Sequence, residues 1–136
     1  YYEQPEETAR AMRNGWLHSG DVGVFDEEGY LYIVDRIKDI VITGGENVYP
    51  KEVEDLLHQH EAVNECGVVG MPHAEYGEAV TAFVTMKPGK NVDEKTLLAF
   101  CRERMASYKV PKAIRFVTDL QKTPQGKILR RELRKF

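Results

Sequence analysis

The chain has 136 residues, of which 42% are hydrophobic and 30% are charged, with a net charge of -3. This composition excludes a disordered polypeptide, and the length allows one compact domain but not two full ones. No apolar run approaches the roughly 18 residues of a membrane-spanning helix, so we expect no transmembrane segment. The sequence starts at Tyr1 without a signal-peptide pattern, and we interpret it as part of a longer cytoplasmic protein.

The charges are unevenly distributed along the chain. Residues 1–35 carry two basic and eight acidic side chains, a sum of -6, whereas residues 100–136 carry eleven basic and three acidic ones, a sum of +8. A basic C-terminal quarter favours a polyanionic partner such as a nucleotide, a phosphorylated cofactor or a nucleic acid. A solvated charged surface explains the same composition equally well.

The first 35 residues predict short elements with little core of their own. A short helix is expected over residues 5–13 and is ended by Asn14 and Gly15. Two strands, residues 22–25 and 30–34, flank a turn that ends in glycine and form a hairpin. We interpret this segment as the tail of another domain, with a boundary near residues 35–38.

The remainder predicts a domain of mixed α and β structure. A strand over residues 37–42 enters a turn at Gly44 and Gly45, and Pro50 opens an amphipathic helix. Two core strands are expected over residues 63–71 and 79–86, followed by a capped helix over 92–105. Another strand is expected over 113–117, and a basic amphipathic helix over 127–136 starts at Lys127. The capping residues expected for the middle helix are Asn91 and Glu94. This order indicates an α+β domain with a largely antiparallel sheet.

Two cysteines, Cys66 and Cys101, are too few for a disulfide scaffold or a zinc site built from cysteine pairs. Both lie among apolar neighbours and are expected to be buried thiols. The histidines His58 and His60 are spaced two apart and make a poor metal pair. No nucleophile elbow, Walker loop or H-E-x-x-H motif is present, and no metal ligands are assigned.

A few positions have both a structural and a functional interpretation. Asp21 follows Gly20 and either forms an Asx turn or accepts hydrogen bonds from a ribose diol. Arg36 is either a surface arginine or a phosphate or ribose contact. Gly44 and Gly45 either form a tight turn or let a ligand approach the bare backbone. Lys127, expected at a helix start where the macrodipole disfavours a cation, is a candidate anion ligand.

Three motifs in order resemble one family, the adenylate-forming enzymes. Residues 14–21 (NGWLHSGD) resemble the family's G-W-x-x-T-G-D motif, with Ser19 replacing threonine. Residues 35–54 resemble the hinge and glycine-loop motif, although Lys38 stands where many members have Asp. Residues 121–133 resemble the C-terminal lysine motif. Details at residues 34–36, 47–50, 108–112 and 127–134 are similar to long-chain fatty acyl-CoA ligases, whereas GGEN at 44–47 is closer to aryl- and medium-chain ligases.

The resemblance implies a two-domain organisation. Residues 1–37 correspond to the end of a large N-terminal adenylation domain, and residues 38–136 to a mobile lid, an α+β domain with a few-stranded, largely antiparallel sheet and two to three helices. The implied reaction couples a carboxylate with ATP to give an acyl-adenylate and pyrophosphate, and coenzyme A then displaces AMP to give the thioester. The implied partners are the large domain, a fatty acid and CoA, without nucleic acid; peripheral membrane contact through the large domain is left open.

The resemblance also assigns roles to individual residues. Lys127 is the catalytic cation of adenylate formation, Asp21 and Arg36 bind the ribose of ATP or AMP, and Lys38 is the hinge. Gly44, Gly45 and Glu46 line the passage for the pantetheine arm of CoA. Mg²⁺, the phosphate loop and the acyl pocket belong to the large domain, so the isolated chain is expected to be inactive.

Three alternatives remain open at this point. A medium-chain or aryl-CoA ligase differs only in substrate. A peptide-synthetase adenylation domain shares the fold, but a carrier domain is expected to follow it. A freestanding nucleotide- or nucleic-acid-binding module would use the basic C-terminal helix, but that helix lacks interleaved aromatic residues.

Overall fold

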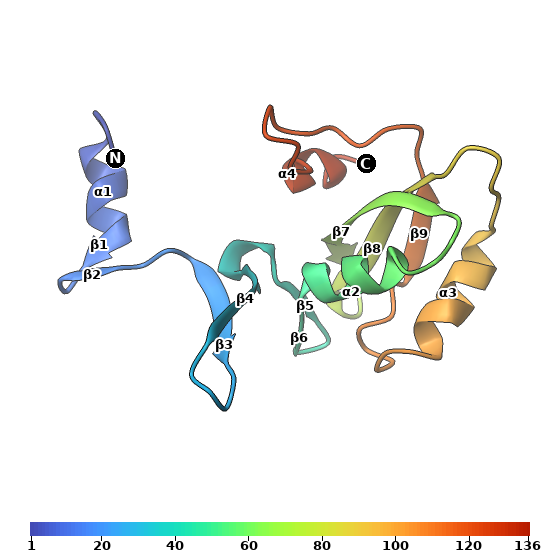
Figure 1. The fold of residues 1–136 in the computed structure, drawn as a ribbon, viewed down its shortest axis with the longest axis horizontal. Coiled ribbons are helices and arrows are strands. Elements are labelled where there is room, and N and C mark those ends of the chain that lie inside the picture. Colours follow the sequence, from blue (N-terminus) through green and yellow to red (C-terminus); the bar gives the residue numbers. More distant parts are fainter. The chain divides into compact units, whose positions relative to one another are not determined.

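A computed structural model describes residues 1–136 and divides into two compact units (Figure 1). Unit 1 is Tyr1–Lys38 and unit 2 is Asp39–Phe136.

Unit 1 consists of one short helix and two small hairpins. Helix α1 (Pro5–Ala11) is followed by strands β1 (Met12–Arg13) and β2 (Trp16–Leu17), which pair around Asn14 and Gly15. Both turn residues have positive φ, 53° and 79°, as the tight turn of a two-residue hairpin requires. Strands β3 (Asp21–Phe25) and β4 (Leu31–Arg36) form the second, antiparallel hairpin, confirming that prediction.

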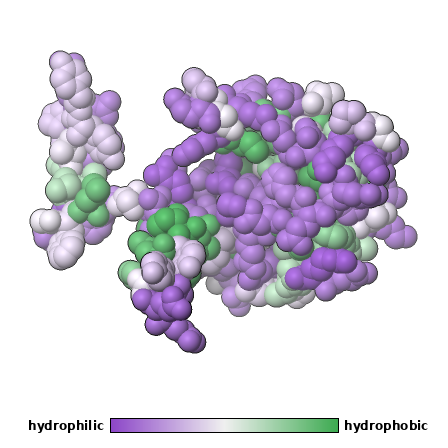
Figure 2. All heavy atoms as spheres, viewed as in Figure 1, coloured by the Kyte–Doolittle hydropathy of each residue, from purple (hydrophilic) through white to green (hydrophobic).

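Unit 1 leaves nearly all of its apolar side chains exposed. Its one buried residue is the polar Asp35, and the buried hydrophobic residues of the chain start at Val41. Trp16 is 76% exposed and Phe25 72% exposed, and the apolar residues of β3 and β4 form a continuous patch (Figure 2). Unit 1 therefore has no hydrophobic core of its own.

The prediction of a strand over residues 37–42 is wrong for the first half of that range. Residues Ile37–Asp39 form a single 3₁₀ turn, and strand β5 covers only Val41–Thr43. The backbone N–H of Ile37 donates to Gly20 O at 2.9 Å, so it is not available to a neighbouring strand. The division between the units falls inside this turn.

Unit 2 is built on a five-stranded sheet in which strands β6, β5, β8 and β7 follow one another and β9 also pairs with β8. Strand β6 (Glu46–Val48) pairs antiparallel with β5, and β7 (Val63–His73) pairs antiparallel with β8 (Gly77–Met86). Strand β9 (Ala113–Phe116) runs parallel to β8. The expected α+β fold with a largely antiparallel sheet is confirmed.

The two faces of this sheet are covered by different segments. Helices α2 (Pro50–Leu57) and α3 (Glu94–Arg102) supply Val53, Leu57, Leu97 and Cys101 to the larger hydrophobic cluster. The C-terminal segment with helix α4 (Arg130–Leu133) supplies Leu133 to a second cluster around Phe83. Alternate residues of the central strands thus serve opposite faces, as the period of a strand requires.

Two expectations about helix ends are wrong. The N-cap of α3 is Asp93, which accepts from Thr96 N at 2.7 Å, whereas Glu94 accepts from Ile114 N of strand β9 at 2.9 Å. Helix α4 starts at Arg130, three residues after Lys127, and has only four residues. Lys127 is therefore not at a helix N-terminus, and the dipole argument for it does not hold. None of the helices combines the length and the apolarity needed to cross a bilayer.

Candidate functional site

Lys127 closes a tight turn in the C-terminal segment. Thr123 N donates to Lys127 O at 2.8 Å, and Gly126 N donates to Thr123 O at 2.9 Å. Pro124 and Gly126 occupy the positions that a type I turn favours, and Gly126 has φ 81°. Lys122 and Ile128 pair on either side, so a short hairpin presents Lys127 at its end.

The amine of Lys127 is exposed and free. Its Nζ has no hydrogen-bond or ion-pair partner, whereas Nζ of the neighbouring Lys122 lies 2.6 Å from Glu65 Oε1. Two lysines of one hairpin therefore differ in role. Lys122 fastens the hairpin to β7, and Lys127 offers three N–H donors and a positive charge to an external anion.

Gly44 and Gly45 form the turn between β5 and β6. Thr43 and Glu46 pair across it, and both glycines have positive φ, 57° and 86°. This conformation strains any residue with a Cβ, so the turn alone explains both glycines. A Cβ on Gly45 would nevertheless meet no atom within 4 Å, so the turn is open on that side.

The β5–β6 hairpin is fastened to the sheet by few contacts. Strand β5 pairs with β8 at Thr43 and Gly77 only. Glu78 Oε2 accepts from Ile42 N at 2.9 Å, and Tyr76 O accepts from Gly44 N at 3.0 Å. A side chain and a loop carbonyl thus replace the missing ladder bonds and position the glycine turn.

The Lys127 hairpin and the glycine turn lie at opposite ends of the β7–β8 pair. Glu65, which holds Lys122, is paired with Thr85 at the open end of that pair, whereas Gly77, which pairs with Thr43, is at its tip. The strand rise separates Glu65 from the tip by roughly 25 Å. In Figure 1, the segment leading to α4 and the β5–β6 hairpin accordingly lie on opposite sides of unit 2.

Asp21 and Arg36 are brought together in unit 1. They face each other across β3 and β4, and Arg36 Nε donates to Asp21 Oδ1 at 3.0 Å. The two side chains remain 29% and 51% exposed, respectively. Because each carboxylate oxygen accepts more than one hydrogen bond, Asp21 can hold Arg36 and still accept from an external hydroxyl.

Lys38 and Glu46 are exposed, and neither side chain has a polar partner. Lys38 is the last residue of unit 1, within the 3₁₀ turn, and Glu46 follows the two glycines at the start of β6. The 136 residues contain no group of three or more His, Cys, Asp or Glu arranged to hold a metal ion.

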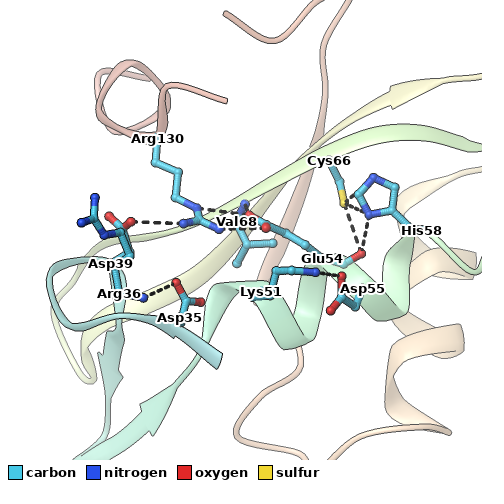
Figure 3. Close-up of polar contacts among 10 residues, drawn as sticks. All are labelled: Asp35, Arg36, Asp39, Lys51, Glu54, Asp55, His58, Cys66, Val68 and Arg130. Atoms are coloured by element: carbon cyan, nitrogen blue, oxygen red, sulfur yellow. Dashed lines mark hydrogen bonds and ion pairs between the residues drawn. The ribbon is translucent and has the colours of Figure 1, made fainter. Parts of the chain in front are cut away.

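One polar cluster of unit 2 was not predicted from the sequence. Arg130, considered above only as part of the basic C-terminal segment, pairs with Glu54 and Asp39 inside unit 2 (Figure 3). A signal for Glu54 was present, because it shares the helical stripe of Pro50, Val53 and Leu57, all of which are buried. A carboxylate at a core position of an amphipathic helix indicates a buried partner.

The two cysteines are structural, as expected. Both are buried, and the Cys66 thiol donates to Glu54 O over 3.5 Å. Burial, helped by the charge of Glu54, raises the pKa of the Cys66 thiol far above its usual value, and burial raises the pKa of Cys101 to about 11. Because the thiolate is the reactive form, the thiols of Cys66 and Cys101 are unreactive in the folded state.

We therefore expect neither cysteine to react with a disulfide reagent such as DTNB at pH 8 while the chain is folded, and both to react in guanidinium. Absorbance at 412 nm follows the reaction. Prompt modification of the folded chain would show that the segments covering Cys66 or Cys101 open readily.

Comparison with known proteins gives a consistent picture. The AMP-binding enzyme C-terminal domain matches residues 52–127. The chain is 55% identical over 133 residues to the long-chain-fatty-acid–CoA ligase of Bacillus subtilis (strain 168), covering 98% of this chain and 24% of that protein. It is 50% identical over 135 residues to the 2-succinylbenzoate–CoA ligase of Geobacillus kaustophilus (strain HTA426), covering 99% and 28%.

A solved structure is similar throughout unit 1 and unit 2. The o-succinylbenzoate CoA synthetase of Bacillus subtilis, in complex with its acyl-adenylate intermediate, has a TM-score of 0.91 and 38% identity, covering 98% of this chain and 27% of that one. The chain thus spans about a quarter of the length of the relatives that it matches. The motifs, the fold of unit 2 and these matches agree that the chain belongs to the family of AMP-binding enzyme C-terminal domains, which is part of the adenylate-forming superfamily.

Proposed function

We propose that the full-length protein containing this chain is an ATP-dependent acid–thiol ligase that converts fatty acids, long-chain ones in particular, into their CoA thioesters. The observation that carries the proposal is the likeness to a long-chain-fatty-acid–CoA ligase along nearly all of the chain. The same chain is nearly as similar to an aryl-acid ligase, so the substrate is the part of the proposal that most needs a test.

We assign residues 1–37 to the end of a large adenylation domain and residues 38–136 to its lid. The support is physical: unit 1 exposes Trp16, Phe25 and its other large apolar side chains and has no core. Contiguous exposed apolar surface of this kind is expected to be covered in the folded protein. The remainder of the large domain is the proposed cover.

In the first half-reaction, a carboxylate oxygen of the acid attacks the α-phosphorus of ATP, and the bond to pyrophosphate breaks. We assign to Lys127 the stabilisation of the charge that builds between the carboxylate and the α-phosphate. Its free amine at the end of a hairpin suits this role. Asp21 accepts from the ribose hydroxyls, and Arg36 holds Asp21 in place through their 3.0 Å hydrogen bond.

In the second half-reaction, the thiol of CoA attacks the acyl carbonyl, AMP leaves and the thiol proton is lost. We assign Gly44, Gly45 and Glu46 to the passage of the pantetheine arm. Lys127 and the glycine turn lie too far apart on unit 2 to serve one site at the same time. Rotation of the lid about Lys38 between the half-reactions resolves this conflict.

The substrates and cofactors follow from the same assignment: ATP, CoA and Mg²⁺, with Mg²⁺ held by the large domain and neutralising phosphate charge. We place the enzyme in the cytoplasm, with peripheral membrane contact through the large domain still to be tested. A nucleic-acid-binding role is disfavoured, since α4 is a single turn and its Arg130 is already engaged by two carboxylates.

The test is turnover of the full-length protein with ATP, CoA and a panel of carboxylic acids. The panel runs from C6 to C18 fatty acids and includes succinylbenzoate and ferulate. We expect acyl-CoA and AMP to form in equal amounts, fastest with the long-chain acids. The 136-residue chain alone is expected to form none, because it lacks the acyl pocket and phosphate loop.

The outcomes separate the parts of the proposal. Faster turnover of an aryl or medium-chain acid would replace the substrate and leave the two half-reactions intact. Acyl-CoA formation by the isolated chain would contradict the division of labour between lid and large domain. Absence of any acyl-adenylate with every acid would contradict the proposed reaction itself.

A further inference from the structure

One guanidinium joins three parts of unit 2 that are far apart in the sequence (Figure 3). Arg130 Nε and Nη2 donate to the two carboxylate oxygens of Glu54 at 3.2 and 2.8 Å, and its Nη1 donates to Asp39 Oδ2 at 3.1 Å. Glu54 Oε1 also accepts from Val68 N at 2.9 Å. Arg130 therefore joins helix α4 to helix α2 and to the first residue of unit 2, and Glu54 extends the cluster to strand β7.

This cluster is partly withdrawn from solvent. The side chains of Arg130, Asp39 and Glu54 are 20%, 15% and 11% exposed. Charge-assisted bidentate bonds are strong and directional, and they are screened less when they are buried. The adjacent Arg131 provides a contrast, because its side chain is 79% exposed and its Nε lies 3.3 Å from Glu132 Oε1.

The positions of the three residues in the chain are informative. Asp39 directly follows Lys38, and Arg130 comes three residues after Lys127. On both sides of Arg130 the chain packs closely on the sheet, since a Cβ on Gly67 would lie 3.2 Å from Ile128 and 2.7 Å from Leu133 in α4. The segment that carries Lys127 is thus docked by apolar contacts and anchored by one polar cluster, which also holds the residue after the hinge.

We propose that Arg130 is a positioning residue for adenylate formation, which joins Asp39, the residue after the hinge, to the segment carrying Lys127. The inference rests on the function proposed above. When the lid turns about Lys38, the Arg130 cluster makes the Lys127 hairpin follow as part of one rigid body. A catalytic group must be held close to its productive position, and an error of 1 Å can cost up to about a hundredfold in rate.

The test uses the full-length enzyme and measures the two half-reactions separately. Pyrophosphate release reports adenylate formation, and thioester formation from supplied acyl-adenylate reports the second step. We expect Arg130→Met to lower the adenylation rate constant by tenfold to a hundredfold and to leave the KM for ATP and the thioester step within about twofold. Arg131→Met is the matched control and should change neither step.

A second variant avoids leaving Glu54 without its partner, which could prevent folding. Asp39→Ala removes only the contact to the residue after the hinge and keeps the bidentate Glu54–Arg130 pair. We expect it to lower adenylation alone, by about three- to tenfold, and to add nothing further when combined with Arg130→Met, because Asp39 acts only through its contact with Arg130. Thermal unfolding checks that each variant is folded.

The outcomes are distinct. Equal loss of both half-reactions in Asp39→Ala, or no loss in either, would overturn the positioning role. A Lys127→Ala variant measured in parallel reports on the function itself. If Lys127→Ala loses adenylation selectively and the Asp39 and Arg130 variants do not, only the present inference fails. If Lys127→Ala is not selective, the proposed function of Lys127 fails.

Discussion

Replacing Lys127 with alanine in the full-length enzyme is expected to slow acyl-adenylate formation by on the order of a hundredfold or more, equivalent to about 3–4 kcal/mol of transition-state stabilisation. Thioester formation from supplied acyl-adenylate should be nearly unchanged. The reason is that Lys127 Nζ has no partner within the lid, so its charge is available to the reacting carboxylate and α-phosphate. Pyrophosphate release and thioester formation measure the two steps.

Lys122→Ala is the matched control for Lys127→Ala. Both lysines belong to one hairpin, but Nζ of Lys122 forms an ion pair with Glu65 Oε1 at 2.6 Å. Its loss should weaken the hairpin's attachment and leave a smaller effect on adenylation. Acylation of the Lys127 amine removes the charge and should reproduce the alanine variant. If Lys127→Ala slowed both half-reactions equally, Lys127 would be structural.

Lys38→Pro is expected to give the reverse pattern. Proline fixes φ near -65°, removes the backbone N–H and restricts the residue before it, so the 3₁₀ turn Ile37–Asp39 loses its freedom to rotate. The lid should then remain in its adenylating position. Pyrophosphate release should survive, and thioester formation should fall by on the order of a hundredfold. Loss of adenylation with thioester transfer retained, in a folded variant, would mean that the two half-reactions are assigned to the wrong parts of the lid.

Gly45→Leu tests the proposed passage of the pantetheine arm beside the glycine turn. The side chain would stand where the pantetheine arm is proposed to pass, so thioester formation should fall while adenylation survives. Gly45 has φ 86°, so the substitution also adds backbone strain of about 1–3 kcal/mol. Gly89→Leu is the matched control, since Gly89 has φ 73°, open space around its Cα and a position beyond the other end of β8. It should match the loss of stability without the loss of thioester formation.

The core of unit 2 could be predicted from the sequence because its signals are local. The apolar runs that became β7 and β8 are long and rich in β-branched residues, and the stripe of Val53 and Leu57 has helical spacing. The glycine turn was predictable for the same reason, since two adjacent glycines between strands favour a hairpin.

The details that could not be predicted depend on partners distant in sequence. Glu94 has the spacing of a capping residue, but its carboxylate accepts instead from the backbone N–H of Ile114, twenty residues on. Glu54 is buried because Arg130, 76 residues later, neutralises it. The residues after Lys127 have helical periodicity, but Ile128 is taken by the pairing with Lys122, which delays the helix to Arg130.

In the proposed mechanism, one small lid serves two half-reactions with two separate parts of its surface. The most direct measurement is the ratio of the adenylation rate constant to the thioester rate constant, determined for Lys127→Ala and Lys38→Pro in the same full-length enzyme. We expect the ratio to fall on the order of a hundredfold in Lys127→Ala and to rise by a similar factor in Lys38→Pro. A ratio that moves in the same direction in both folded variants, or in neither, would contradict it.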